Sequence, residues 1–365
     1  MKKAVVPIII FIAFVGIYIG ISLVRDNYYL FQPVWDVGHY LTISEDGYET
    51  FPCRDARGNL AGTVCGNVGW YPMWPLVVAL VRPILGGSSP AAFMVLTYLF
   101  CLLSFIFLYR LIEKIYSAGA AVFSLLALAF GPASFYLITG FPYAFFLFLF
   151  TVYLYLLYQF SGIKRDIGLF ITALAISLTY PTGILFVFIP LLWYFGRNNT
   201  EGKPSGSAMR LLTLLKYIIP FILGPLLLCA YFYFKFDDFF LLLHFQEKFD
   251  RTWAFPLWIM LKTLLNYSLL RPENVTVLWY GLIFVLFYPY KIRRELWIMA
   301  LILYFFSPAT GTMMSIYRHY LIIFPAYLIV GTSERPVWLK AVFIIVGLVL
   351  ALTILFPKFM AYRLI

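Results

Sequence analysis

Long apolar stretches follow one another along almost the whole chain, and most charged residues lie at their ends or in the segments between them. Hydrophobic residues make up 63% of the 365 residues and charged residues 12%, with a mean hydropathy of +0.90. A water-soluble core of this length cannot bury so much apolar surface. The sequence therefore predicts an all-α, polytopic membrane protein whose helices satisfy their own backbone groups in lipid.

The apolar runs set the expected spans. We expect an uncleaved first helix over 4–24, because the run is long enough to span and no small-residue cleavage site follows it. Further spans are expected at 91–112, 118–137, 143–160, 168–179, 183–195, 211–234, 275–290, 296–306, 320–330 and 338–356. The count is about eleven crossings in one transmembrane domain over 1–365, provided that Pro181-Thr182-Gly183 separates two short helices.

Basic residues account for the topology. The formal net charge is +11. Its cations cluster near 110–114, 164–165, 197–216, 291–294 and 335–340, and the positive-inside rule places these segments in the cytoplasm. The charge therefore predicts orientation and an affinity for anionic lipid head groups rather than a nucleic-acid partner.

This orientation puts the N-terminus in the cytoplasm and two long polar segments, 25–87 and 235–274, on the extracytoplasmic side. Within them we expect juxtamembrane helices at 71–85 and 256–270, because both stretches mix apolar residues with breaks or polar residues. The loop at 196–208 is the longest cytoplasmic one and includes Lys203.

The first extracytoplasmic segment carries the strongest candidate chemistry. Asp36 follows Trp35 shortly after the first span, and His39 lies one helical turn further on, on the same side of a helix. A carboxylate here has two readings: a general base that takes a proton from a hydroxyl, or a cap of the next helix. A second candidate is Arg318, whose guanidinium suits a phosphate, although snorkelling to the interface is an equal alternative.

Metal and disulfide chemistry are less sharply indicated. The chain has three His, at 39, 244 and 319, with no HExxH motif and no paired CxxC, so we expect no metal cofactor. Carboxylate pairs such as Glu45-Asp46 leave a divalent cation open. Cys53 and Cys65 share the first extracytoplasmic segment, where an oxidising compartment favours a disulfide, whereas the other two cysteines lie in predicted spans as packing residues.

Five sequence stretches together resemble one family. They are Trp35-Asp36-Val37-Gly38-His39-Tyr40 with the later Tyr71-Pro72-Met73-Trp74-Pro75, Gly131 to Phe135, Pro181-Thr182-Gly183, Phe236 to Arg251, and Ser315 to Pro325. In this order they resemble the GT-C superfamily of membrane glycosyltransferases, in particular the mannosyltransferases related to PIG-V and to bacterial enzymes that extend phosphatidylinositol mannosides.

The resemblance implies a metal-independent, inverting hexosyltransferase of GT-C type. It would move a sugar, mannose by this likeness, from a polyprenyl-phosphate donor to a lipid or glycan acceptor in the cell envelope, as a monomer. Asp36 would be the catalytic base. The implied donor-binding residues are Arg318, His319, Tyr320, Gln246, Lys248 and Arg251. The implied acceptor-binding residues are Trp35, His39, Tyr40, Glu45 and Asp46. The alternative from another class is a non-enzymatic lipid or solute transporter, for which broken helices and intramembrane charge also argue.

Overall fold

The computed structural model describes residues 2–54, 58, 60–197, 207–249, 251–288 and 291–364. Lys203, in the predicted cytoplasmic loop, therefore lies outside the described residues. The chain divides into two compact units. Unit 1 comprises Met1–Gln32, Thr97–Leu154 and Trp253–Ile365, and unit 2 comprises Pro33–Leu96 and Tyr155–Thr252.

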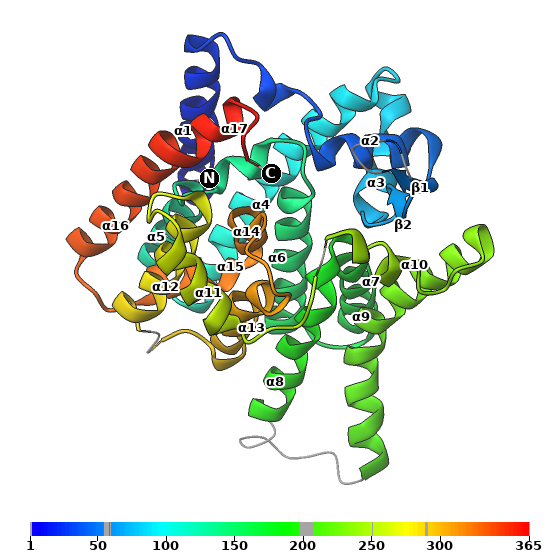
Figure 1. Ribbon diagram of the computed structural model, residues 1–365. Coiled ribbons are helices and arrows are strands. Elements are labelled where there is room, and N and C mark those ends of the chain that lie inside the picture. The colour runs from blue at the N-terminus through cyan, green and yellow to red at the C-terminus, as the bar shows by residue number, and fades with distance from the viewer. Residues whose placement is uncertain are drawn as a thin grey trace. The chain divides into compact units, whose positions relative to one another are not determined.

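Unit 1 is built from helices alone in its described residues. They are α1 (Lys2–Val24), α5 (Ala118–Ala129), α11 (Pro256–Asn266), α12 (Pro272–Leu286), α13 (Arg294–Ala309), α14 (Ile316–His319), α15 (Phe324–Thr332), α16 (Val337–Leu350) and α17 (Phe356–Met360) (Figure 1). Two long helices, α4 (Ser89–Ile115) and α6 (Tyr143–Gln159), have one end in each unit.

These helices match the spans expected from the apolar runs. Within the described residues, four helical segments are long and apolar enough to cross a membrane: Val5–Val24, Ser89–Ile115, Leu211–Phe236 and Val337–Met360. Shorter apolar helices follow most of the other predicted runs. The chain is an integral membrane protein with the predicted all-α architecture, and the count of eleven crossings stays a prediction.

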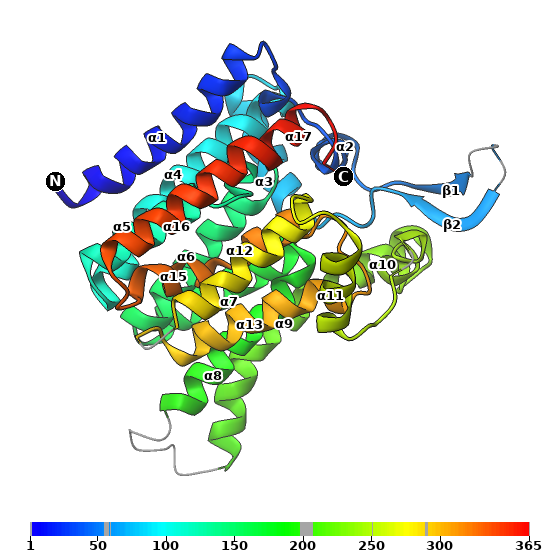
Figure 2. The ribbon, with the colours of Figure 1, turned by 60° about the vertical axis from the view of Figure 1, so that its left-hand side comes forward.

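Small residues allow the helices of unit 1 to pack closely. A Cβ on Gly331 of α15 would overlap Ser124 and the backbone of Ala120 in α5, so glycine is required where these helices cross. The Ser117 side chain caps α5 by accepting a hydrogen bond from the Ala120 amide, 3.1 Å away. Figure 2 shows α1 near α16 and α17, and the Tyr18 ring contacts Phe356 at 4.9 Å between centroids.

Unit 2 combines helices with the two strands of the described chain. Its elements are α2 (Asp36–Asp46), β1 (Thr50–Arg54), β2 (Leu60–Gly66), α3 (Met73–Val81), α7 (Ile163–Thr179), α8 (Phe188–Arg197), α9 (Ser207–Phe236) and α10 (Leu241–His244). Helix α7 ends at Thr179 because Tyr180 adopts the extended backbone favoured before proline, and a 3-10 turn begins at Pro181. This confirms the predicted break between two short helices.

The antiparallel hairpin of β1 and β2 is the element that the sequence reading missed (Figure 2). The sequence analysis expected no strand within the segment 25–87, yet this segment supplies both β1 and β2. A disulfide joins Cys53 in β1 to Cys65 in β2, which answers the question that the cysteine spacing left open. The expected helices at 71–85 and 256–270 are present as α3 and α11.

Candidate active site

The candidate site of unit 2 begins where α2 begins. Asp36 is the first residue of α2, where a carboxylate interacts favourably with the positive end of the helix dipole. The preceding residue, Trp35, has φ 50° and ψ −127°, a backbone conformation that is strained for a bulky side chain. Such strain concentrates at functional sites because the surrounding structure must compensate for it. The acid therefore occupies a position that the fold specifies closely.

One turn into α2, His39 lies against an aromatic platform. The His39 and Trp70 rings stack with centroids 3.7 Å apart and planes 21° from parallel. Trp70 in turn meets the edge of Phe245, 5.7 Å away at 74°. Gly69 makes this packing possible, because a Cβ there would overlap the Phe245 ring. Residues from α2, from the segment before α3 and from the turn after α10 thus form one surface.

Buried polar contacts hold the Trp70 segment against the end of α2. The Tyr48 hydroxyl donates to the Trp70 carbonyl at 2.7 Å. The side chain of Asn67, which is 1% exposed, donates to the Gly47 carbonyl at 3.1 Å and accepts from the Glu49 amide at 2.9 Å. A buried side-chain amide is costly unless its NH2 group and its oxygen are both hydrogen-bonded. Asn67 therefore fixes the segment before Trp70 against the residues that follow α2.

A cation completes this cluster. The Lys248 ammonium lies 3.7 Å from the centroid of the Phe245 ring, within cation–π range. Burial lowers the pKa of His39, and the Lys248 charge lowers it further, while the Asp36 and Glu49 carboxylates oppose the shift. Burial also lowers the pKa of Lys248. We call Asp36, His39, Trp70, Phe245 and Lys248 the α2 site.

The other predicted residues of unit 2 differ in their surroundings. Tyr40 is buried in α2, whereas Glu45 and Asp46, at the end of the same helix, are exposed. The Oε1 atom of Gln246 is buried and accepts no hydrogen bond from the described residues. Arg251 is exposed, with its guanidinium 5.5 Å from the Phe249 ring centroid. The buried Oε1 atom of Gln246 suits a hydrogen bond from a ligand hydroxyl.

Arg318 lies in unit 1, in the one-turn helix α14. Its guanidinium carbon is 5.6 Å from the centroid of Phe141, so the cation lies beside an aromatic ring. Ser315, just before α14, has φ 58° and turns the chain sharply into that helix. Tyr320 is fully buried, and its hydroxyl donates to the Tyr304 carbonyl at 2.6 Å. Tyr320 therefore supports the turn that carries Arg318 and His319.

The structure adds two residues to the site that the sequence reading did not select: Trp70 and Phe245. Their signal was present in the aromatic run Gly69-Trp70-Tyr71 and in Phe245 beside Gln246, but their proximity to His39 depends on the hairpin folding back. Among the described residues, no three His, Cys, Asp or Glu side chains are grouped so as to hold a metal ion. Independence from metals stays a prediction.

Comparisons with known proteins identify the type of fold. No protein family matches the sequence, and no curated protein matches it. The structure is similar to the crystal structure of ArnT from Cupriavidus metallidurans bound to undecaprenyl phosphate, with a TM-score of 0.54 and 15% identity. The similarity covers 92% of this chain and 63% of the ArnT chain, so this protein spans less than two thirds of its neighbour. The likeness confirms the predicted fold class: the chain is a polytopic membrane protein with a GT-C-type fold.

Proposed function

We propose that this protein is an inverting glycosyltransferase that moves a sugar from a polyprenyl-phosphate donor to a hydroxyl of a lipid or glycan acceptor. The observation that carries the proposal is the α2 site, in which a carboxylate and an imidazole lie beside stacked aromatic rings. Its support from outside the chain is the fold of ArnT, a protein whose structure holds undecaprenyl phosphate. Mannose is the sugar that we propose, on the sequence resemblance.

Asp36 is the proposed general base. Its carboxylate takes the proton of the acceptor hydroxyl as the acceptor oxygen bonds to the anomeric carbon. The bond from that carbon to the phosphate oxygen breaks at the same time, through an oxocarbenium-like state, and the configuration inverts. The electron pair leaves with the polyprenyl phosphate, which needs no proton to depart at neutral pH. His39, which burial keeps neutral, orients the acceptor or the carboxylate.

The remaining residues bind the two substrates in this proposal. Arg318 neutralises the donor phosphate, because a guanidinium offers paired donors to phosphate oxygens. Lys248 or Arg251 assists, with Gln246 and His319 in the same donor-binding set. Tyr320, which the sequence placed in this set, is buried and supports the turn that carries Arg318. The acceptor contacts are Trp35, His39, Tyr40, Glu45 and Asp46, and the structure suggests Trp70 as the stacking surface for a sugar ring.

We also propose that the α2 site faces the extracytoplasmic side, with the N-terminus in the cytoplasm. The Cys53–Cys65 disulfide supports this orientation, because disulfides persist in oxidising compartments. A cysteine introduced at Glu45 should then react with a membrane-impermeant thiol reagent in intact cells, and one at Lys291 should not. The reverse labelling pattern would overturn the orientation.

The experiment that tests the function is product identification. Membranes containing this chain are incubated with a polyprenyl-phosphate mannose donor and a lipid extract, and the lipids are analysed by mass spectrometry. The proposal predicts acceptor lipids heavier by one hexose, which membranes with the Asp36→Asn variant do not produce. Movement of unaltered donor across the membrane, with no heavier lipid, would favour the transporter alternative.

A further inference from the structure

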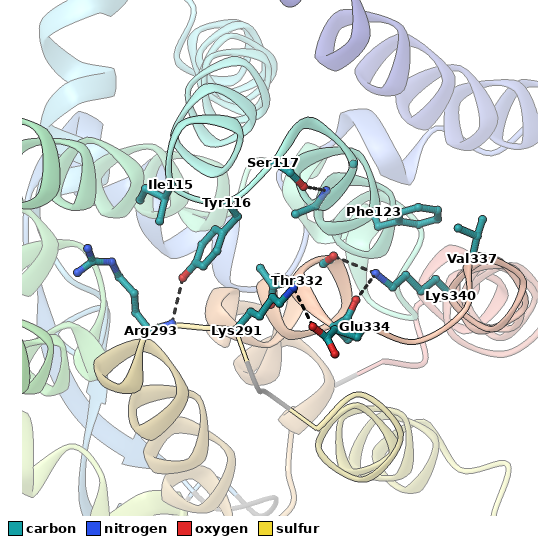
Figure 3. A pocket seen from close by; sticks show the side chains of 14 residues that line it. Ile115, Tyr116, Ser117, Phe123, Lys291, Arg293, Thr332, Glu334, Val337 and Lys340 are labelled. Carbon is teal, nitrogen blue, oxygen red and sulfur yellow. Dashed lines mark hydrogen bonds and ion pairs between the residues drawn. The ribbon is translucent and has the colours of Figure 1, made fainter.

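A second polar region of the molecule lies within unit 1, and none of the residues of the proposed chemistry lines it. A cavity of about 800 Å³ opens at three turns: residues 115–120 between α4 and α5, residues 291–293 before α13, and residues 331–340 between α15 and α16 (Figure 3). This volume suits a small organic ligand or a lipid head group rather than a single ion. We call it the Lys340 cavity.

Hydrogen bonds join the three turns around the cavity. The Tyr116 hydroxyl accepts from the Arg293 amide at 3.0 Å, and Lys291 pairs with Glu334 at 2.8 Å. Two of the turns include residues of the basic segments 291–294 and 335–340, which the sequence placed on the cytoplasmic side, and the third directly follows the basic segment 110–114. Their meeting at one end of unit 1 agrees with the alternation of basic and acidic segments.

The lining is positively charged. Three cations line the cavity, Lys291, Arg293 and Lys340, with Glu334 as the carboxylate among the lining residues. The Arg293 guanidinium also lies 3.4 Å from the carboxylate of Glu295, which does not line the cavity. Lys340 is 6% exposed, and its ammonium donates to the carbonyls of Gly331 at 3.0 Å and Ser333 at 2.7 Å. An ammonium has three donors, so two are used by these neutral acceptors and one is left for a ligand.

Lys340 is also unusual in its own helix. It lies in the first turn of α16, where the helix dipole disfavours a cation. A lysine that only capped α15 would explain the two carbonyl contacts, but not the cavity beside it or the second and third cations. Tyr116 adds a hydroxyl donor to the lining, because its oxygen accepts from the Arg293 amide and its own proton can be donated to a ligand.

We propose that the Lys340 cavity binds a phosphate group, with Lys340, Lys291 and Arg293 as the cations that recognise it. Phosphate matches the lining because its oxygens accept both charge-assisted and hydroxyl hydrogen bonds. The group comes either from an anionic phospholipid of the cytoplasmic leaflet or from a soluble phosphate ester. Both sources present the same chemistry to the cavity, and the experiment separates them.

The test uses the full chain purified in a neutral detergent. Two probes are titrated separately: dioleoylphosphatidylglycerol, detected as bound lipid by native mass spectrometry, and glycerol 3-phosphate, detected by the same method. We expect Lys340→Gln to weaken binding by about ten- to a hundredfold, as expected for a charge-assisted hydrogen bond. Glu334→Gln removes the carboxylate and should strengthen binding several-fold.

The matched control is Arg335→Gln. Arg335 belongs to the same basic turn but does not line the cavity, and its guanidinium donates to the Leu286 carbonyl at 2.7 Å. Binding of the lipid alone assigns the site to a head group, and binding of both probes admits the soluble ester; either result supports the proposal if the control binds like the wild type. Equal weakening in Arg335→Gln, or no binding of either probe, overturns it.

Lys340→Gln also removes the carbonyl contacts of α15 and therefore carries a risk of misfolding. Lys291→Ala covers that case, because its ion pair with Glu334 is exposed and contributes little to stability. This variant should fold normally and weaken phosphate binding several-fold. Unchanged binding in both Lys291→Ala and Glu334→Gln would contradict a phosphate site, whatever the behaviour of Lys340→Gln.

Discussion

The α2 site and the Lys340 cavity both concentrate charge in this apolar chain, and they use it differently. In the cavity, cations contact carbonyl groups and a carboxylate at helix ends, and the positive-inside rule accounts only for the side of the membrane on which we expect them. In the α2 site, an acid and a half-buried imidazole lie beside stacked rings, which topology does not require, because acidic residues contribute little to orientation. The difference favours chemistry at α2 and ligand binding at the cavity.

The largest expected effect is at Asp36. If it is the base, Asp36→Asn should lower sugar transfer by on the order of a hundredfold or more, with the same size of side chain and the same fold. Asp26→Asn is the matched control: this exposed acid follows α1 and has φ 48°, a conformation that asparagine also adopts. The measurement is initial rate in membranes with equal amounts of folded protein. Near-normal transfer by Asp36→Asn would mean that Asp36 only stabilises the start of α2.

Arg318 comes next. Loss of a charge-assisted phosphate contact costs about 1.5–3 kcal/mol, so Arg318→Ala should weaken donor use by about ten- to a hundredfold. Arg318→Lys should rescue only part of this, because lysine keeps the charge and loses the planar fork. Donor titration at saturating acceptor measures the effect, with the exposed Lys262→Ala as control. If the donor dependence stays the same and only the yield of folded protein falls, Arg318 is an interfacial anchor.

Trp70 should show a smaller effect. Its ring stacks on His39 and meets Phe245, and aromatic pairs of this kind contribute about 0.5–1.5 kcal/mol beyond the area that they bury. Trp70→Ala should therefore lower transfer by roughly two- to tenfold, and Trp70→Phe by less. Trp258→Ala, an exposed position on α11, serves as the control. Transfer that is insensitive to both Trp70 substitutions would remove the aromatic platform from the proposed site.

The smallest expected effect is a pH dependence of stability. The pKa of His39 is lower in the folded protein than its ordinary value of about 6.5. As the pH falls below about 6.5, the unfolded chain therefore binds more protons than the folded protein does. The stabilisation from neutral His39 is present above that pH and is lost as the pH falls. The unfolding temperature should therefore fall less at acidic pH in His39→Gln than in the wild type. An equal fall in both proteins would mean that His39 is not the group that titrates.

The sequence predicted the helices well and the α2 site only in part. Apolar runs located α4, α6 and α9 because a long run of apolar residues is recognisable without knowledge of its tertiary contacts. The Tyr180-Pro181 step located a helix end from local backbone sterics alone. By contrast, the stack of Trp70 on His39 depends on hydrogen bonds between residues on either side of the hairpin. Tyr48 bonds to Trp70, and Asn67 bonds to Gly47. Such contacts form only in the folded tertiary structure, so residue types and spacings do not predict them.

The central claim is tested most directly by the stoichiometry of a single reaction. The purified chain, reconstituted in lipid, is given a polyprenyl-phosphate mannose donor and the acceptor lipid identified from membranes. Free polyprenyl phosphate and mannosylated acceptor are then both quantified over time. The account predicts that the two products appear in equal amounts and that both are abolished by Asp36→Asn. Release of polyprenyl phosphate without a mannosylated acceptor, or donor that crosses the bilayer uncleaved, would contradict it.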